Sequence, residues 1–115
     1  MPADRYEWAF RAWPVLTERA RQRSVITYGE LGEALHIHHR TVRLVLEIIQ
    51  DFCLREPLPP LTILVVKKDG NRPGAGFIAW DLGRLDEGYE EVYQFPWGTR
   101  ANPFEFAAQG DVTPR

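Results

Sequence analysis

The sequence predicts an α+β domain that is mainly helical and carries one small β-hairpin. Three observations favour this fold: a sharply marked helix start at Thr27, a long apolar helix after residue 38, and two short β-prone segments separated by a loop containing Gly and Pro. The chain has 115 residues, of which 44% are hydrophobic and 26% are charged. This is the composition of one ordinary globular domain with a core of its own.

Two helices are expected in the first third of the chain. Apolar residues recur at helical spacing over residues 4–23, and Pro14 predicts a break or kink in this first helix. The second helix is expected over residues 28–36. It begins sharply because the hydroxyl of Thr27 can accept from the amide of Glu30, while the carboxylate of Glu30 can accept from the amide of Thr27.

The remaining elements follow in a recognisable order. A third helix is expected over residues 39–54, where apolar residues on two stripes make it central and well buried. Segments 62–67 and 76–80 are expected to pair as a β-hairpin across the loop 68–75. A fourth helix, acidic on its exposed face, is expected over residues 82–92. This order is that of a winged helix-turn-helix domain, in which the hairpin forms the wing.

The end of the chain differs in character from the rest. Residues 1–95 are expected to form the single winged helix-turn-helix-like domain, and residues 96–115 an extended aromatic tail with a frayed end. The tail carries Trp97, Phe104 and Phe106. Such rings either pack on the body of the domain or form an exposed surface for a protein partner.

Charge is divided along the chain. The formal net charge is −2, but residues 19–43 hold five arginines and two acids, and residues 81–91 hold one arginine and five acids. This balance argues against a strongly basic nucleic-acid coat protein and leaves room for a local basic face opposite an acidic one.

The candidate DNA contacts lie in the first turns of the third helix and in the loop of the expected wing. Arginine can pair with phosphate or read guanine, and the amides at a helix start attract phosphate. A solvated polar end of a buried helix is the alternative interpretation of the same residues. The candidates in these two places are His38, His39, Arg40, Thr41 and Arg43, followed by Lys67, Lys68 and Arg72.

No metal site, cofactor or catalytic centre is expected. His36, His38 and His39 fall within four residues, but no further metal ligand lies near them in the sequence. Local phosphate contact or helix capping is therefore the preferred interpretation of these histidines. No nucleophile with a neighbouring base, no carboxylate pair and no phosphate-cradling loop can be argued, so the chain is not expected to be an enzyme.

The single cysteine, Cys53, excludes an intramolecular disulfide and a cysteine-cluster zinc site, and it favours a reducing, cytoplasmic location. No apolar run reaches the length of a membrane span, so no membrane partner is expected. Residues 1–5 open into a charged amphipathic segment, so a signal peptide is not expected.

Several short segments together resemble a known family. They are ITYGEL at residues 26–31, RTV at 40–42, PLP at 57–59, VV at 65–66, DG at 69–70 and GF at 76–77. In this order they resemble the DNA-binding domain of the O6-alkylguanine-DNA alkyltransferases and the alkyltransferase-like proteins. The resemblance covers residues 25–77, about half of the chain.

The resemblance implies a role in DNA repair for two residues. In that family a tyrosine at the start of the capped helix contacts and rotates the target phosphate, and an arginine at the start of the recognition helix enters the base stack as a nucleotide is flipped out. Tyr28 and Arg40 match these positions. The acceptor motif Pro-Cys-His-Arg is replaced by residues 61–64, LTIL, which excludes alkyl transfer by this motif, and Glu56 replaces the family's asparagine.

The sequence therefore favours a non-catalytic protein of alkyltransferase-like build that binds duplex DNA. The alternative is a protein-interaction module, such as an accessory, immunity or regulatory protein, on the same scaffold. Its contact surface would comprise the acidic segment 81–91, the aromatic tail and the second apolar stripe, Leu44 and Ile48.

Overall fold

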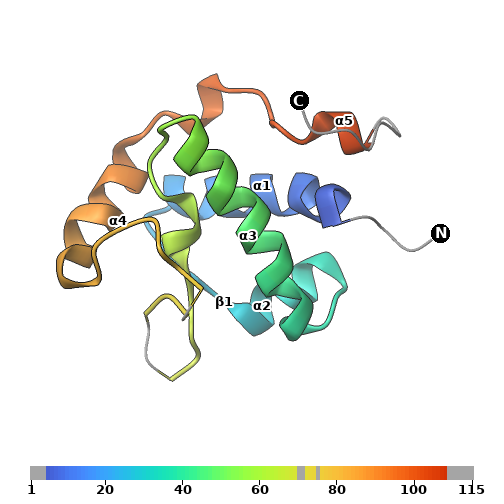
Figure 1. The fold of residues 1–115 in the computed structure, drawn as a ribbon, viewed down its shortest axis with the longest axis horizontal. Coiled ribbons are helices and arrows are strands. Elements are labelled where there is room, and N and C mark those ends of the chain that lie inside the picture. The colour runs from blue at the N-terminus through green and yellow to red at the C-terminus, as the bar shows by residue number, and fades with distance from the viewer. Residues whose placement is uncertain (1–4, 70–71, 75, 109–115) are drawn as a thin grey trace.

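Five α-helices and a two-stranded parallel sheet make up the protein in a computed structural model, which describes residues 5–69, 72–74 and 76–108 (Figure 1). The helices are α1 (Arg5–Arg21), α2 (Tyr28–Leu35), α3 (His39–Arg55), α4 (Leu85–Gln94) and α5 (Glu105–Ala108). The strands are β1 (Ile26–Thr27) and β2 (Val65–Val66), and three short 3-10 turns are η1 (Leu61–Leu64), η2 (Leu82–Arg84) and η3 (Trp97–Thr99). The expected mainly helical fold is confirmed. None of the described helices is long and apolar enough to cross a membrane.

A break or kink was expected at Pro14, and helix α1 is not broken there, since it runs through the proline without interruption. The proline removes one backbone donor. Trp13 and Leu16, on either side of it, are buried in the core and hold the helix in place. The Trp13 ring makes edge contacts with the rings of Phe52 and Phe104, which ties α1 to α3 and to the C-terminal segment.

The expected hairpin wing is wrong for the part of the chain that the structure describes. Segment 62–67 begins in η1, and only Val65–Val66 forms a strand, which pairs in parallel with β1. Segment 76–80 is not a strand. An isolated antiparallel bridge, Val66 to Pro73, is the pairing described there. Gly70, Asn71 and Ala75 lie outside the described residues.

The reason for this difference lies in a side chain of α3. The side-chain amide of Gln50 donates to the carbonyl oxygen of Gly76 (3.2 Å) and accepts from the amide of Ile78 (2.8 Å). These are backbone groups that a hairpin ladder would have used. In addition, every residue from Leu61 to Val66 is buried, and a continuously buried run does not by itself distinguish a strand from a helical turn.

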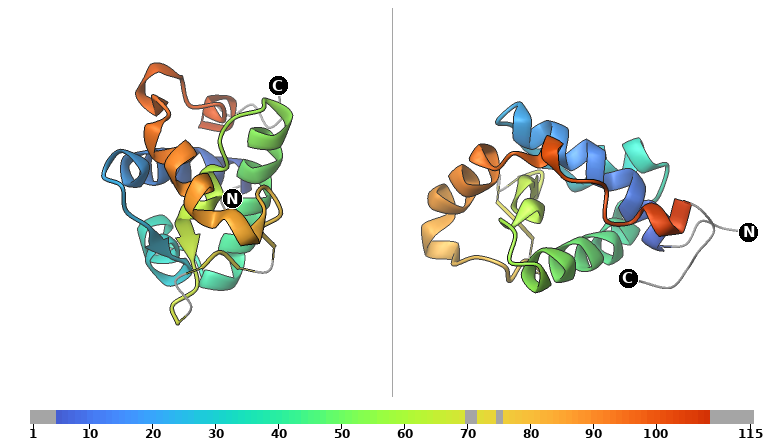
Figure 2. Two further views of the ribbon diagram at one scale, coloured as in Figure 1. Left: turned by 90° about the vertical axis from the view of Figure 1, so that its left-hand side faces the viewer. Right: turned by 90° about the horizontal axis from the view of Figure 1, so that it is seen from above.

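The segment after α4 completes the hydrophobic core. Trp97, Phe104 and Phe106 are all buried, and the indole N–H of Trp97 donates to the carbonyl of Val92 (2.8 Å). Figure 2 shows this segment, in red, running along α1, while α4 lies at the far side of the molecule from α5. The tail rings therefore belong to the core rather than to an exposed surface. Residues 109–115, which were expected to fray, lie outside the described residues.

Candidate nucleic-acid interface

The start of α2 has the expected capping arrangement. The Thr27 hydroxyl accepts from the Glu30 amide (3.1 Å), and the Glu30 carboxylate accepts from the Thr27 amide (2.9 Å). This backbone hydrogen bond, with that of the Thr27 side chain, holds the pKa of the Glu30 carboxyl below its usual value. The cap fixes the direction in which α2 leaves β1, and so it fixes where Tyr28 lies.

A three-residue turn joins α2 to α3. His36 ends α2 in the left-handed conformation, with φ of 58°, and the amide of Ile37 donates to the carbonyl of Gly32 (2.9 Å). His38 caps α3, because its Nδ1 accepts from the amide of Arg40 (3.1 Å). The short turn brings the beginning of α3 directly against α2.

The first turns of α3 present basic side chains to solvent. His39, Arg40 and Arg43 are exposed, and Thr41 is half-buried. None of the three exposed side chains is in an ion pair with another described residue. The sequence thus predicted correctly that this end of the buried helix is polar and cationic.

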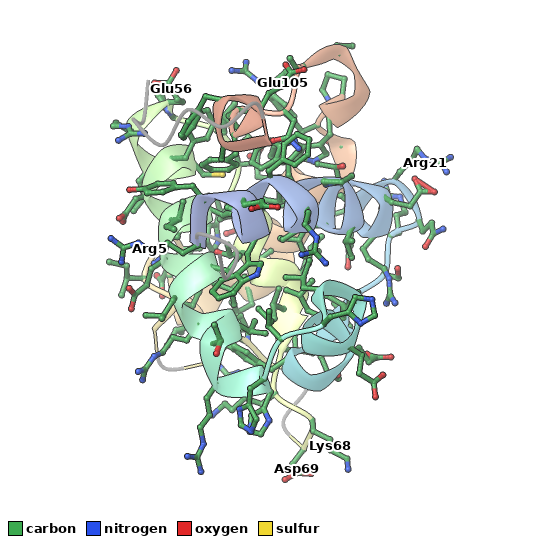
Figure 3. The ribbon with its side chains drawn as sticks, turned by 90° about the vertical axis from the view of Figure 1, so that its right-hand side faces the viewer. Arg5, Arg21, Glu56, Lys68, Asp69 and Glu105 are labelled. Atoms are coloured by element: carbon green, nitrogen blue, oxygen red, sulfur yellow. The ribbon has the colours of Figure 1, made fainter. Side chains whose placement is uncertain are left out.

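The lysines after β2 lie at the same end of the molecule. Lys67 and Lys68 are exposed, and Figure 3 shows Lys68 and Asp69 at the same end of the molecule as the beginning of α3, with Glu56 beyond the other end of that helix. Arg72 is not part of this group, because its guanidinium donates to the carbonyl of Leu82 (3.3 Å). We define the basic surface as Arg40, Arg43, Lys67 and Lys68.

A narrow pocket lies beside the basic surface. It is lined by Tyr28, Arg43, Leu46, Glu47, Gln50, Thr62, Gly76 and Phe77, and its volume is about 20 Å³. This is room for about one water molecule. The pocket therefore joins α2, α3, η1 and the segment after Pro73 at one place.

Tyr28 forms a wall of the pocket and is packed against Gly74. A Cβ at Gly74 would overlap the Tyr28 hydroxyl, so glycine is required for this approach. Burial raises the pKa of the Tyr28 phenol above its usual value, and a backbone hydrogen bond with Gly74 acts in the opposite direction. The phenol is therefore neutral at physiological pH.

Thr62 supplies an unusual group to the same pocket. Its side chain is 5% exposed, and its hydroxyl oxygen has no hydrogen-bond partner among the described residues. A buried polar atom without a partner is costly unless a water or a ligand satisfies it.

The other candidate groups do not form a site. The structure shows no group of three or more His, Cys, Asp or Glu side chains within its described residues that could hold a metal ion. The rings of His38 and His39 are 4.2 Å apart, and His38 is used as a cap. Burial raises the pKa of the Cys53 thiol to about 11, so this thiol stays protonated at neutral pH and has little nucleophilic character.

Sequence reasoning did not foresee the pocket, and the two buried polar residues that it overlooked there are Gln50 and Thr62. Gln50 had a signal, because it is a polar residue within the apolar stripe of the third helix, where an amide must find a buried partner. Thr62 had none, because it lay in a β-branched run that fits a strand equally well. No family model, curated protein or solved structure matches the chain.

Proposed function

We propose that this chain is a non-catalytic DNA-binding protein that contacts duplex DNA through the start of α3 and the neighbouring lysines. The observation that supports this most is the basic surface itself, in which Arg40 and Arg43 of α3 lie at the same end of the molecule as Lys67 and Lys68. In this proposal α2 and α3 are a helix-turn-helix, and residues 67–69 take the place of a wing.

The basic surface supplies the two kinds of contact that DNA binding needs. Arg40 and Arg43 are long enough to reach phosphates or to pair with guanine in the major groove. Lys67 and Lys68 act as point charges on the phosphate backbone. The imidazole of His39 and the hydroxyl of Thr41 add hydrogen-bonding groups near the start of α3.

In the proposed alkyltransferase-like build a nucleotide leaves the duplex, and the pocket beside Tyr28 is the place where it would be received. The resemblance assigns Tyr28 to the target phosphate and Arg40 to the gap in the base stack. Tyr28 lines the pocket, and the Thr62 hydroxyl offers a hydrogen bond inside it. At about 20 Å³ the pocket is too small for a base, so the segment containing Gly76 and Phe77 must move before a base can enter.

A fluorescence-anisotropy titration with labelled duplex DNA tests the proposal. If the four cations neutralise four phosphates, the logarithm of the association constant should fall with a slope of about −3.6 against the logarithm of the salt concentration. The affinity should therefore drop by about 150-fold between about 50 and about 200 mM salt. Arg40→Ala should lose most of the affinity. The matched control is Arg55→Ala, which removes an exposed cation from the other end of the same helix. Binding by Arg40→Ala and Arg43→Glu that equals the parent would overturn the proposal.

A second duplex separates repair from general DNA binding. The titration is repeated with a duplex that carries one O6-alkylguanine, because the alkyltransferase-like build predicts tighter binding to the lesion. Equal affinity for both duplexes would reject the repair role and leave DNA binding in place.

The alternative function, a protein-interaction module, is supported by the exposed acidic face of α4. Of its other two expected surfaces, the aromatic tail is not available, since Trp97, Phe104 and Phe106 are buried, whereas in the second apolar stripe Leu44 is exposed and Ile48 is half-buried. The same titration separates the two functions, because an interaction module predicts no DNA binding even at low salt.

A further inference from the structure

The chain carries a second charged surface, which is acidic and distinct from the basic surface. We define the acidic surface as Asp81, Asp86, Glu87 and Glu91, all of which are exposed. Asp81 directly precedes η2, and the other three lie on α4. Helix α4 and the beginning of α3 lie on different sides of the molecule (Figures 1 and 2). The acidic side chains of α4 and the cationic side chains at the start of α3 therefore lie on different sides of the molecule.

Most of these charges are not neutralised within the chain. On the acidic surface Glu87 pairs with Arg84, whereas Asp86 and Glu91 are in no ion pair with a described residue. The four cations of the basic surface are likewise in none. Each surface thus keeps a net charge that an oppositely charged partner can use.

Each surface also exposes a large apolar side chain. Leu82 is 52% exposed and lines the same shallow hollow as Asp86 and Glu87. Leu44 is 40% exposed and follows Arg43 on α3, four residues after Arg40. An exposed apolar side chain beside complementary charges gives a protein contact some apolar area to bury. The two surfaces therefore match one another in charge and in apolar content.

We propose that the acidic surface of one copy of this chain docks on the basic surface of a second copy, and that DNA competes with this contact. Each contact joins the acidic surface of one copy to the basic surface of another, and the rotation between the copies decides whether the assembly closes. A small charged contact of this kind is weak and is weakened further by salt. Only the competition with DNA rests on the proposed function, because self-association requires no nucleic acid.

Sedimentation velocity of the full chain tests the self-association. The weight-average mass should rise with protein concentration in about 20 mM salt and fall to the monomer in about 300 mM salt. Asp86→Lys removes a charge from the acidic surface and Arg43→Glu removes one from the basic surface, so each variant should stay monomeric at low salt. The control Glu105→Lys makes the same charge change on α5, outside both surfaces, and should associate like the parent.

Mixing the two variants gives the sharpest result. The Arg43→Glu chain keeps its acidic surface, and the Asp86→Lys chain keeps its basic surface. An equimolar mixture should therefore form one-to-one dimers and nothing larger, although neither variant associates alone. A monomeric parent at low salt, or a mixture that stays monomeric, would overturn the proposal.

Adding a short unlabelled duplex to the parent tests the competition. We expect the larger species to disappear and to be replaced by one protein bound per duplex. Asp86→Lys should bind DNA at least as tightly as the parent, because it leaves the basic surface intact. If DNA binding fails while the mixture still forms dimers, the proposed function is wrong and the self-association stands. If the parent binds DNA but does not self-associate, the self-association is wrong and the proposed function stands.

Discussion

Gly32 lies where α2 comes closest to the beginning of α3, and its replacement by alanine is a direct test of how these helices pack. A Cβ at Gly32 would lie 2.9 Å from the carbonyl oxygen of Ile37 and 3.5 Å from the backbone nitrogen and Cα of His39. These are backbone atoms, which cannot turn aside as the end of a side chain can. Gly32→Ala must therefore push α2 away from the turn that leads into α3.

The size of the effect follows from comparison with Gly29 in the same helix. A Cβ at Gly29 has only the Thr27 hydroxyl oxygen nearby, at 4.0 Å, so Gly29→Ala is expected to stabilise the protein by up to about 1 kcal/mol. The same entropic gain at Gly32 is opposed by overpacking, which costs about 1–3 kcal/mol. The two variants should therefore differ by about 1–3 kcal/mol in their free energies of unfolding, with Gly32→Ala the less stable.

Urea unfolding followed by tryptophan fluorescence measures this difference, because the chain has four tryptophans. Gly32→Ala should have the lower midpoint, with an unchanged dependence on urea concentration. The close approach of α2 and α3 would be refuted if Gly32→Ala were as stable as Gly29→Ala.

Three further predictions concern buried groups near the pocket. Gln50→Leu leaves the Gly76 carbonyl and the Ile78 amide without their partner, so the free energy of unfolding, measured by urea unfolding, should fall by about 2 kcal/mol or more. A variant as stable as the parent would contradict these two hydrogen bonds. Thr62→Val removes a buried hydroxyl without a partner and should raise the free energy of unfolding by about 1 kcal/mol, whereas a decrease would indicate that a water satisfies the hydroxyl. Burial raises the pKa of the Cys53 thiol to about 11, so this thiol stays protonated at pH about 8. At that pH iodoacetamide should label the native protein far more slowly than the urea-unfolded protein, and mass spectrometry measures the difference.

Elements that depend on neighbours within four residues could be predicted from the sequence. The start of α2 is the clearest case, because Thr27 and Glu30 cap it through bonds that span three residues. The bounds of α3 were also close, since its apolar stripes repeat at helical spacing over its whole length. In both cases the signal and the structure that it specifies lie in the same short segment.

The hairpin failed for the opposite reason. Whether segment 76–80 forms a strand depends on what pairs with its backbone, and its partner is the side chain of Gln50, 26 and 28 residues away. A pattern of β-prone residues carries no information about such a competitor. The parallel pairing of Val65 with Ile26 is likewise set by where α2 and α3 place the two segments.

The candidate site divides in the same way. Arg40 and Arg43 could be placed on the surface because their positions on an amphipathic helix decide their exposure. Arg72 is exposed as well, but the direction of its side chain could not be predicted, because its guanidinium donates to the carbonyl of Leu82, ten residues further along. The pocket was not foreseen at all, since its walls come from separate segments that only the folded chain brings together.

The way in which the pocket wall is held also decides how easily the pocket can open. Gln50 fixes Gly76 and Ile78 with two hydrogen bonds, whose net contribution is about 1–3 kcal/mol together. A ligand that binds only the open form, at about 1,000 times its dissociation constant for that form, stabilises it by about 4 kcal/mol, which exceeds this cost. If segment 76–80 were a hairpin strand, opening the pocket would also break a ladder of backbone hydrogen bonds. Gln50→Leu therefore tests the pocket together with the fold: affinity for DNA that is kept or increased while stability falls is the result expected when a side chain holds the pocket closed.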